Sequence, residues 1–254
     1  MTLKNKVALI TGGSSGIGRA SALSFVQQGA KVVVADINEE GGSETVNLIK
    51  AAGGEATFIR TDVSHAADVE AMVQYTVATY GRLDCGFNNA GAVAAHLEAI
   101  SPTHEYPEEN FDQVIAVNLK GIWLCMKYEI RQMLKQGGGV IVNTASALGL
   151  VGIENLSGYV ASKHGVVGIT KTAALEYATR GIRINAVCPG YVQTPMTQNR
   201  LKDPEVQKRI EAIHPMGRVG TPEEVAETVV YLCSDAASFV TGHAMAIDGG
   251  WTAH

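Results

Sequence analysis

Cysteine is scarce in this chain, and histidine is not arranged for metal binding. The four cysteines are far apart and form no Cys-x-x-Cys pair, and the seven histidines form no His-Glu-x-x-His pair. These absences favour reduced core thiols over a disulfide framework or a zinc site, so no metal ion is expected. The cysteines are Cys85, Cys125, Cys188 and Cys233.

Long apolar runs and runs of like charge are also missing. No stretch approaches the roughly 18 apolar residues of a membrane span, and residues 1–10 hold too short an apolar run for a secretory signal. Lys and Arg total 20 against 25 Asp and Glu, so no basic stripe is available for nucleic acid or a membrane surface. We therefore expect a cytoplasmic protein whose partner is a small molecule.

The chain does have a regular alternation of short β-branched runs and longer amphipathic stretches. Its 254 residues, 46% of them hydrophobic, can bury a sizeable core. The alternation predicts a single-domain α/β fold, a Rossmann-like doubly wound parallel sheet of about seven strands with helices on both faces. Strands are expected at residues 7–10, 31–35, 56–60, 83–87, 140–143, 182–187 and 244–247. Helices are expected at residues 17–28, 41–51, 66–80, 108–135, 155–179 and 222–232.

No linker or repeat divides the chain, so residues 1–254 are expected to form one dinucleotide-binding and catalytic domain. Its least regular stretch is residues 191–220, which contains three prolines. We interpret this stretch as a substrate-covering insertion.

A glycine-rich turn directly follows the first expected strand. It reads Thr11-Gly-Gly-Ser-Ser-Gly-Ile-Gly18, and a helical pattern follows. In this context backbone N–H groups can approach a pyrophosphate with no side chains in the way, and the helix dipole favours its charge. A glycine cluster alone is more often a plain turn, so the interpretation depends on the strand and helix beside it. The expected cofactor contacts are Gly12, Ser14, Ser15, Gly16, Ile17 and Gly18.

Asp36 ends the second expected strand, 18 residues past the last glycine of the turn and close to the roughly 20 expected for a ribose-binding acid. A carboxylate accepts hydrogen bonds from both adenosine ribose hydroxyls but repels a 2′-phosphate. Ser15 and Ile37 place no cation where one would most simply neutralise that phosphate, although Arg19 or Arg60 could reach it. The sequence therefore predicts NAD rather than NADP. The alternative is that Asp36 only caps a strand end.

Tyr159 and Lys163 are the clearest candidates for acid–base chemistry. They lie four residues apart in a helical pattern, hence on one face, and no other tyrosine has a lysine at this spacing. A phenol titrates near pH 10 and needs a neighbouring cation to become a usable base. Alone, such a pair is common on surfaces. Ser146 favours a catalytic role, because it follows the strand at 140–143 on the edge where doubly wound folds bind ligands.

These motifs resemble those of the short-chain dehydrogenases and reductases over essentially the whole chain. The family signature TGxxxGxG matches residues 11–18, and the other matches follow in the family's order. They are DV at 62–63, NNAG at 88–91, VN at 117–118, Ser146, YVASK at 159–163, PG at 189–190 and DGG at 248–250.

The resemblance implies hydride transfer between NAD(H) and a secondary alcohol or ketone. Ser146 would bind the substrate oxygen and Tyr159 would pass the proton. Lys163 would lower the tyrosine pKa and hold the nicotinamide ribose, and Asn118 would hold a water of the proton relay. The alternative for Asn118 is an amide that only stabilises a neighbouring element. The resemblance further implies cofactor contacts from Asp62, Val63, Asn89, Ala90, Gly91, Pro189, Gly190, Val192 and Thr194.

The segments expected to face the substrate are mostly apolar: residues 92–96, residues 147–153, and Met196 with the insertion. This composition favours a hydrophobic carbonyl compound. His96, Glu154 and His214 are possible polar contacts, and the alternative for each is a solvated loop position. Similar family members act on simple or aryl ketones, cyclic diols and 3-oxoacyl groups, which the sequence does not separate.

Two rival functions share the cofactor site. A nucleotide-sugar epimerase or dehydratase usually carries a larger sugar-binding domain than this chain can supply, and a non-enzymatic dinucleotide sensor typically lacks the tyrosine. The helices expected at 108–135 and 155–179 carry more apolar surface than one sheet face needs, as in relatives that pair them across a two-fold axis. Together with Trp251 near the carboxyl end, this surface predicts a homotetramer.

Overall fold

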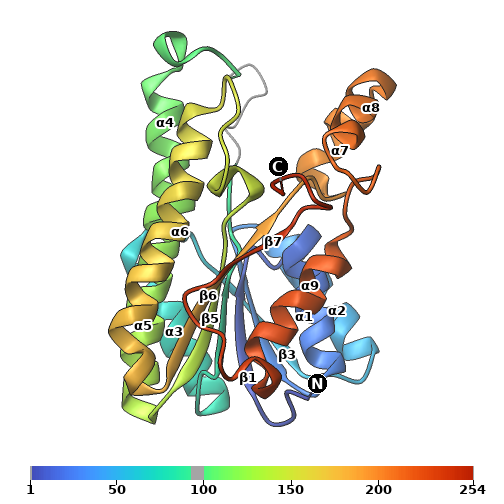
Figure 1. The fold of residues 1–254 in the computed structure, drawn as a ribbon. Helices are drawn as coiled ribbons and strands as arrows, with labels where there is room; N and C mark the ends of the chain where they lie inside the picture. The colour runs from blue at the N-terminus through green and yellow to red at the C-terminus, as the bar shows by residue number, and fades with distance from the viewer. Residues whose placement is uncertain (1, 93–99, 254) are drawn as a thin grey trace.

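The centre of the structure is a sheet of seven parallel strands (Figure 1). The computed structural model describes residues 2–92 and 100–253. The strands lie in the order β3-β2-β1-β4-β5-β6-β7, so the chain winds outward from β1 and then crosses back to β4. This arrangement confirms the predicted fold class. The bounds are β1 (Val7–Thr11), β2 (Lys31–Asp36), β3 (Ala56–Arg60), β4 (Cys85–Asn88), β5 (Gly139–Thr144), β6 (Ile182–Pro189) and β7 (Ala244–Ile247).

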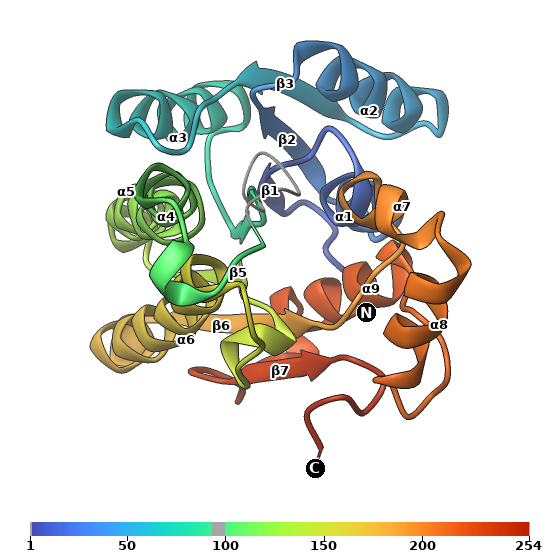
Figure 2. The same ribbon diagram turned by 90° about the horizontal axis from the view of Figure 1, so that it is seen from above.

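Helices cover both faces of the sheet, which Figure 2 shows from above. The bounds are α1 (Gly16–Gln27), α2 (Glu39–Ala51), α3 (Ala66–Tyr80), α4 (Glu108–Val114), α5 (Ile122–Gln136), α6 (Ser157–Tyr177), α7 (Pro195–Leu201), α8 (Pro204–Ala212) and α9 (Pro222–Cys233). One apolar core joins α1, α2 and α9 to the sheet, and a second joins α3, α5 and α6 to its other face. Every residue of β1 and β4 is buried, as expected for strands covered on both sides. Within residues 2–92 and 100–253, no helix has the length and apolar character needed to cross a membrane.

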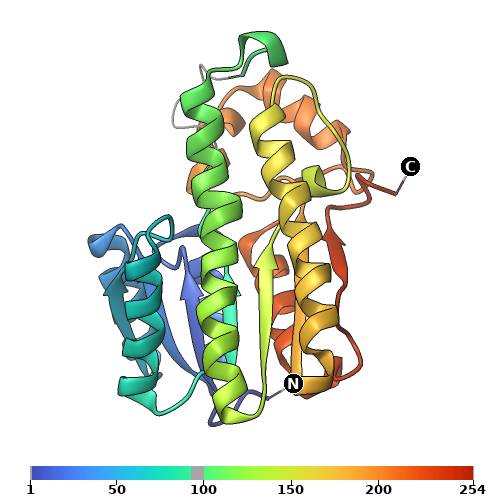
Figure 3. The same cartoon turned by 90° about the vertical axis from the view of Figure 1, so that its left-hand side faces the viewer.

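The helix expected at residues 108–135 is continuous, but its geometry changes from α-helical to π-helical and back (Figure 3). A π-helical segment, η3 (Ile115–Gly121), joins α4 to α5 and contains Asn118. Such wide turns are rare inside helices and are frequent at functional sites. The hydrophobic period predicted one helix here and did not distinguish a π-helical segment from an α-helical one.

Two other segments also differ from expectation. The helix expected from residue 155 begins at Ser157, because Asn155 has a φ of 65°, which a right-handed helix does not accept. The stretch at 191–220 contains two helices, α7 and α8. Pro195 and Pro204 start them, since proline at the first helical position loses no internal hydrogen bond.

The carboxyl ends of the strands gather the candidate residues at one edge of the sheet. The glycine turn follows β1, Asp36 ends β2, Asn89 follows β4, Ser146 follows β5 and Gly190 follows β6. Parallel strands end at the same edge, and ligands bind there in open α/β sheets.

Candidate active site

A cavity of about 600 Å³ opens at this edge of the sheet. Its lining contains most of the residues that the sequence predicts to contact the cofactor or substrate. These are Gly12, Ser14, Ser15, Gly16, Ile17, Asp36, Ile37, Asp62, Val63, Asn89, Ala90, Gly91, Ala92, Ser146, Tyr159, Lys163, Pro189, Gly190, Val192, Thr194 and Met196.

Other residues of the lining were missed by the sequence reasoning. They are Ala35, Thr61, Ser64, Gln113, Ala116, Val117, Thr144 and Ala145, whereas Pro195 and Thr197 fall in the insertion that was expected to face the substrate. Gln113 had a signal, since it precedes Val117 of the VN motif by one helical turn and therefore shares its face. Ala147, Leu148 and Gly149 were expected to face substrate, but they form a buried 3₁₀ turn behind the lining.

The glycine turn brings bare backbone to the cavity. Gly12 and Gly16 have φ values of 67° and 51°, which side-chain-bearing residues rarely adopt. A Cβ on Gly12 would lie 2.9 Å from the backbone of Ala90, and one on Gly18 would collide with the Gly12 carbonyl. Gly18 therefore lies behind the lining and allows the close packing of α1. The Ser15 side chain caps no amide of α1, so the first N–H groups of this helix remain available to an anion.

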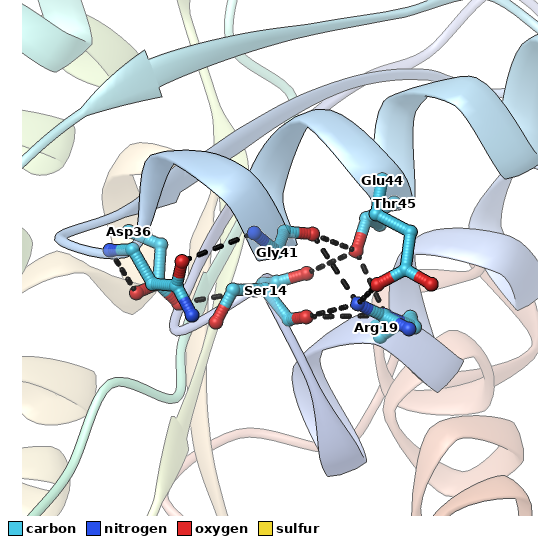
Figure 4. Close-up of polar contacts among 8 residues, drawn as sticks. Ser14, Arg19, Asp36, Gly41, Glu44 and Thr45 are labelled. Atoms are coloured by element: carbon cyan, nitrogen blue, oxygen red, sulfur yellow. Dashed lines mark hydrogen bonds and ion pairs between the residues drawn. The ribbon is translucent and has the colours of Figure 1, made fainter.

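Asp36 is held rigidly at the end of β2. One carboxylate oxygen accepts the Ser14 amide at 3.0 Å, and the other accepts the Asn38 amide at 2.9 Å. These contacts tie the carboxylate to the glycine turn, as Figure 4 shows. Each oxygen has a second lone pair that can accept a further hydrogen bond.

Arg19 is occupied by neighbouring groups (Figure 4). Its guanidinium donates to the Ser14 carbonyl at 2.6 Å and to Thr45 Oγ1 at 3.0 Å, and it pairs with Glu44 at 2.6 Å. Arg60, the other cation that the sequence left open, lies 3.5 Å from a carboxylate oxygen of Glu39. Each arginine thus has a carboxylate partner.

Asp62 also lines the cavity and remains an anion. Burial alone would raise its pKa, but hydrogen bonds from the Ser64 amide at 2.9 Å and the Ser64 hydroxyl at 2.7 Å hold the pKa below its ordinary value.

Ser146, Tyr159 and Lys163 meet at the inner end of the cavity. Lys163 is 3% exposed, donates to the Thr144 carbonyl at 2.8 Å and lies 5.6 Å from the centre of the Tyr159 ring. Burial lowers the pKa of Lys163 to about 8. Burial raises the pKa of Tyr159 above its ordinary value, and the Ser146 hydroxyl opposes this rise. Near pH 7 the site therefore holds a charged lysine beside a protonated phenol.

Asn118 is fully buried behind the lining. Its Oδ1 accepts the Ala92 amide at 2.7 Å, and its Nδ2 donates to the Ala92 carbonyl at 2.8 Å and to Ser162 Oγ at 3.3 Å. Both amide hydrogens are therefore used within the protein. The side chain clamps the backbone that follows Gly91.

The three possible polar contacts with substrate have different outcomes. His96 lies outside the described residues. Glu154 is exposed and is not part of the cavity lining. His214 is 3% exposed, and both of its ring nitrogens have protein partners, so it matches neither a substrate contact nor a solvated loop position.

Metal ligands do not gather at this site. Across the part of the chain that the structure describes, no three His, Cys, Asp or Glu side chains lie where they could hold a metal ion. The polar groups of the cavity are instead backbone amides, hydroxyls, carboxylates and one buried ammonium.

Comparisons with known proteins find similar chains of similar length. A family model described as Enoyl-(Acyl carrier protein) reductase matches residues 12–252. Cyclohexanol dehydrogenase of Acinetobacter sp. (strain SE19) is 50% identical over 248 residues, 98% of this chain and 95% of that one. The crystal structure of levodione reductase is 41% identical with a TM-score of 0.94, covering 98% of both chains. That of a putative 2-deoxy-D-gluconate 3-dehydrogenase from Agrobacterium tumefaciens with bound NADP is 34% identical with a TM-score of 0.90, covering 100% of this chain and 98% of that chain.

Proposed function

Because this chain belongs to the short-chain dehydrogenase/reductase family and acts on secondary alcohols or ketones, we propose that it uses NAD(H) and takes a hydrophobic, cyclic substrate. The observation that carries the proposal is the meeting of Ser146, Tyr159 and Lys163 in a cavity that is also lined by the bare backbone of the glycine turn.

The residues of the cavity fit a dinucleotide. The available amides of α1 and the absence of a side chain at Gly12 suit a pyrophosphate, and the Asp36 carboxylate suits a ribose diol. When bound, the nicotinamide supplies the hydride acceptor for oxidation and the hydride donor for reduction. The protein supplies placement through Pro189, Gly190, Val192 and Lys163, which line the cavity.

Tyr159 moves the proton in this mechanism. In ketone reduction its phenol donates a proton to the forming alkoxide, while the Ser146 hydroxyl donates a hydrogen bond to the same oxygen. In alcohol oxidation the phenolate accepts the hydroxyl proton. The Lys163 ammonium stabilises that phenolate, since an adjacent positive charge favours the ionised form.

Asn118 acts by holding the Ala92 backbone rather than by touching substrate. Its side-chain contacts to Ala92 fix the exit of the chain from Gly91 into the cavity rim. Both hydrogens of the Asn118 side-chain amide already donate within the protein. The relay water that the family resemblance implies would therefore have to bind a different atom.

The NAD preference rests on the charges around Asp36. Its carboxylate would repel a 2′-phosphate, and Arg19 and Arg60 are each paired with a carboxylate rather than left to neutralise that phosphate. Freeing Arg19 would break its contacts to Glu44, Thr45 and the Ser14 carbonyl.

The cyclic substrate is supported by apolar lining at the substrate end, including Ala92 and Met196, and by the similarity to Cyclohexanol dehydrogenase. A 3-oxoacyl thioester and a cyclic diol are the alternatives within the same reaction class. We propose that α7, which contributes Pro195, Met196 and Thr197 to the lining, covers the bound substrate.

We also propose a homotetramer and a cytoplasmic location. Trp123 on α5 and Leu175 on α6 are 46% and 85% exposed, as expected for helices that bury apolar side chains against another subunit. A single monomeric species in sedimentation would overturn the tetramer. The four cysteines are free and buried, which supports a reducing compartment.

The test compares the wild-type protein with Tyr159→Phe. NADH and NADPH absorbance is followed with cyclic, aryl, alkyl and 3-oxoacyl ketones. We expect turnover with NADH on cyclic ketones, a loss of about 10²–10⁴-fold in the variant, and unchanged NADH binding. Faster turnover with NADPH would contradict the NAD assignment. NADH binding without turnover on any ketone would instead favour a dinucleotide sensor.

A further inference from the structure

His214 occupies a closed position behind the wall formed by Pro189 and Gly190. Its Nε2 lies 3.1 Å from the Tyr191 amide nitrogen, and its Nδ1 lies 2.7 Å from the Ile210 carbonyl oxygen. A backbone N–H can only donate and a carbonyl can only accept. The two contacts therefore specify the neutral imidazole with its proton on Nδ1, which donates to Ile210 while Nε2 accepts from Tyr191.

Three segments far apart in the sequence meet at this imidazole: the end of β6, the end of α8 and the tail after β7. A Cβ on Gly190 would lie 2.7 Å from His214 Nε2 and 3.0 Å from Asp248 Cα, so the packing is tight. The ring of Trp251 lies 5.5 Å from that of His214 and stacks on Tyr191 at 5.9 Å with an interplanar angle of 20°. The segment after β7, through Trp251, thus covers the imidazole.

We propose that His214 is a positioning residue that fixes the wall at the nicotinamide end of the cavity. Its Nε2 holds the Tyr191 amide and thereby fixes the backbone of Pro189, Gly190 and Val192, which line the cavity. Without this acceptor, the Tyr191 amide just after β6 would have no hydrogen-bond partner. The backbone of the wall would then shift until that amide found another acceptor. The inference rests on the proposed function, because that function assigns this wall to the cofactor.

The test uses the two side-chain amides, which separate the two hydrogen bonds of His214. His214→Gln sets an acceptor oxygen near the place of Nε2 and can keep the bond from Tyr191. His214→Asn sets a donor NH₂ near the place of Nδ1, can keep the bond to Ile210 and leaves the Tyr191 amide without an acceptor. The measurements are the NADH dissociation constant from a fluorescence titration, kcat and KM with a cyclic ketone, and the melting temperature.

We expect His214→Gln to stay within about twofold of the wild type, and His214→Asn to weaken NADH binding and lower kcat by about tenfold each, the scale of one buried amide left unpaired. The KM for the ketone should change less than kcat, since the substrate-side residues of α7 are not held by His214.

Equal losses of NADH affinity and kcat in the two variants would mean that His214 contributes packing alone. Unchanged values in His214→Asn would mean that the backbone of the wall keeps its position without the hydrogen bond from Tyr191. Either result overturns the proposal. If His214→Asn does not fold, His214→Phe, which keeps a ring but supplies no nitrogen, replaces it in the comparison. If the wild-type protein binds NADH but turns over no ketone, the proposed function fails, while the ratio of NADH dissociation constants still tests His214.

Discussion

Glu129 offers the sharpest test of the physical reasoning, because it is a fully buried carboxyl group that the chemistry does not use. It lies on α5, where one oxygen accepts a hydrogen bond from Asn88 Nδ2 at 2.9 Å. Its other oxygen, and Asn88 Oδ1, have no hydrogen-bond partner within residues 2–92 and 100–253. A proton on the carboxyl group would supply one donor to a pair of side chains that has two surplus acceptors. The neutral acid is therefore the form that suits this environment.

Burial raises the pKa of Glu129 from its ordinary value of 4.5 to about 7. At about 1.4 kcal/mol for each pH unit, ionising the carboxyl group in the folded protein costs roughly 3 kcal/mol of stability. The sign follows from proton counts. Between pH 4.5 and pH 7 the folded chain keeps the proton that the unfolded chain loses, so the free energy of unfolding falls as pH rises and levels off above about pH 7.

Glu129→Gln keeps the shape of the neutral acid and removes the titration. We expect the variant to lie within about 1 kcal/mol of the wild type at pH 5 and to exceed it by roughly 3 kcal/mol at pH 8, measured by denaturant unfolding at one protein concentration. Glu70→Gln, at an exposed position on α3, is the control and should show the same difference from wild type at both pH values. Parallel curves for the wild type and Glu129→Gln between pH 5 and pH 8 would refute the reasoning.

The remaining predictions concern the cofactor site. Asp36→Ser combined with Glu44→Gln removes the repulsive carboxylate and the ion pair of Arg19, while the Arg19 contacts to the Ser14 carbonyl and Thr45 remain, so kcat/KM with NADPH should rise about threefold relative to Asp36→Ser alone, by absorbance assay; equal values would show that Glu44 does not restrain the arginine. Gly18→Ala should lower stability by roughly 3 kcal/mol and weaken NADH binding, because the new Cβ overlaps the glycine turn. Gly168→Ala, where a Cβ meets nothing within 4 Å, is its control and should raise the melting temperature slightly. A stable Gly18→Ala protein would contradict the steric argument.

The fold was predictable because the strands of this sheet are covered on both faces. Short runs of apolar, β-branched residues such as 32–34 indicate buried strands, and the amphipathic stretches between them supply the two covering layers. The helices at 195–201 and 204–212 were missed because they are short and their prolines read as breakers, although each proline marks a helix start. The π-helical segment was missed because the sequence reasoning looked only for the α-helical period.

The site residues that the sequence identified are those whose chemistry is carried by residue type and spacing, as for Tyr159 and Lys163. Residues that act through one partner brought close by the fold could not be assigned in this way. The sequence offered His214 as a possible substrate contact, with a solvated loop position as the alternative. Its actual partners, Tyr191 and Ile210, depend on how α8 packs behind the end of β6.

Glu129 and Arg19 show which charged residues can be interpreted from the sequence and which cannot. The buried positions of α5 recur at helical spacing, and Glu129 falls among them between Met126 and Met133, so a carboxyl group in the core could have been read from the periodicity. Arg19 carries no such signal, since its availability to a 2′-phosphate depends on Glu44, 25 residues later and beside it only after α1 and α2 have packed. Predicting the cofactor preference therefore needs the partner of Arg19 as well as the acid at the end of β2.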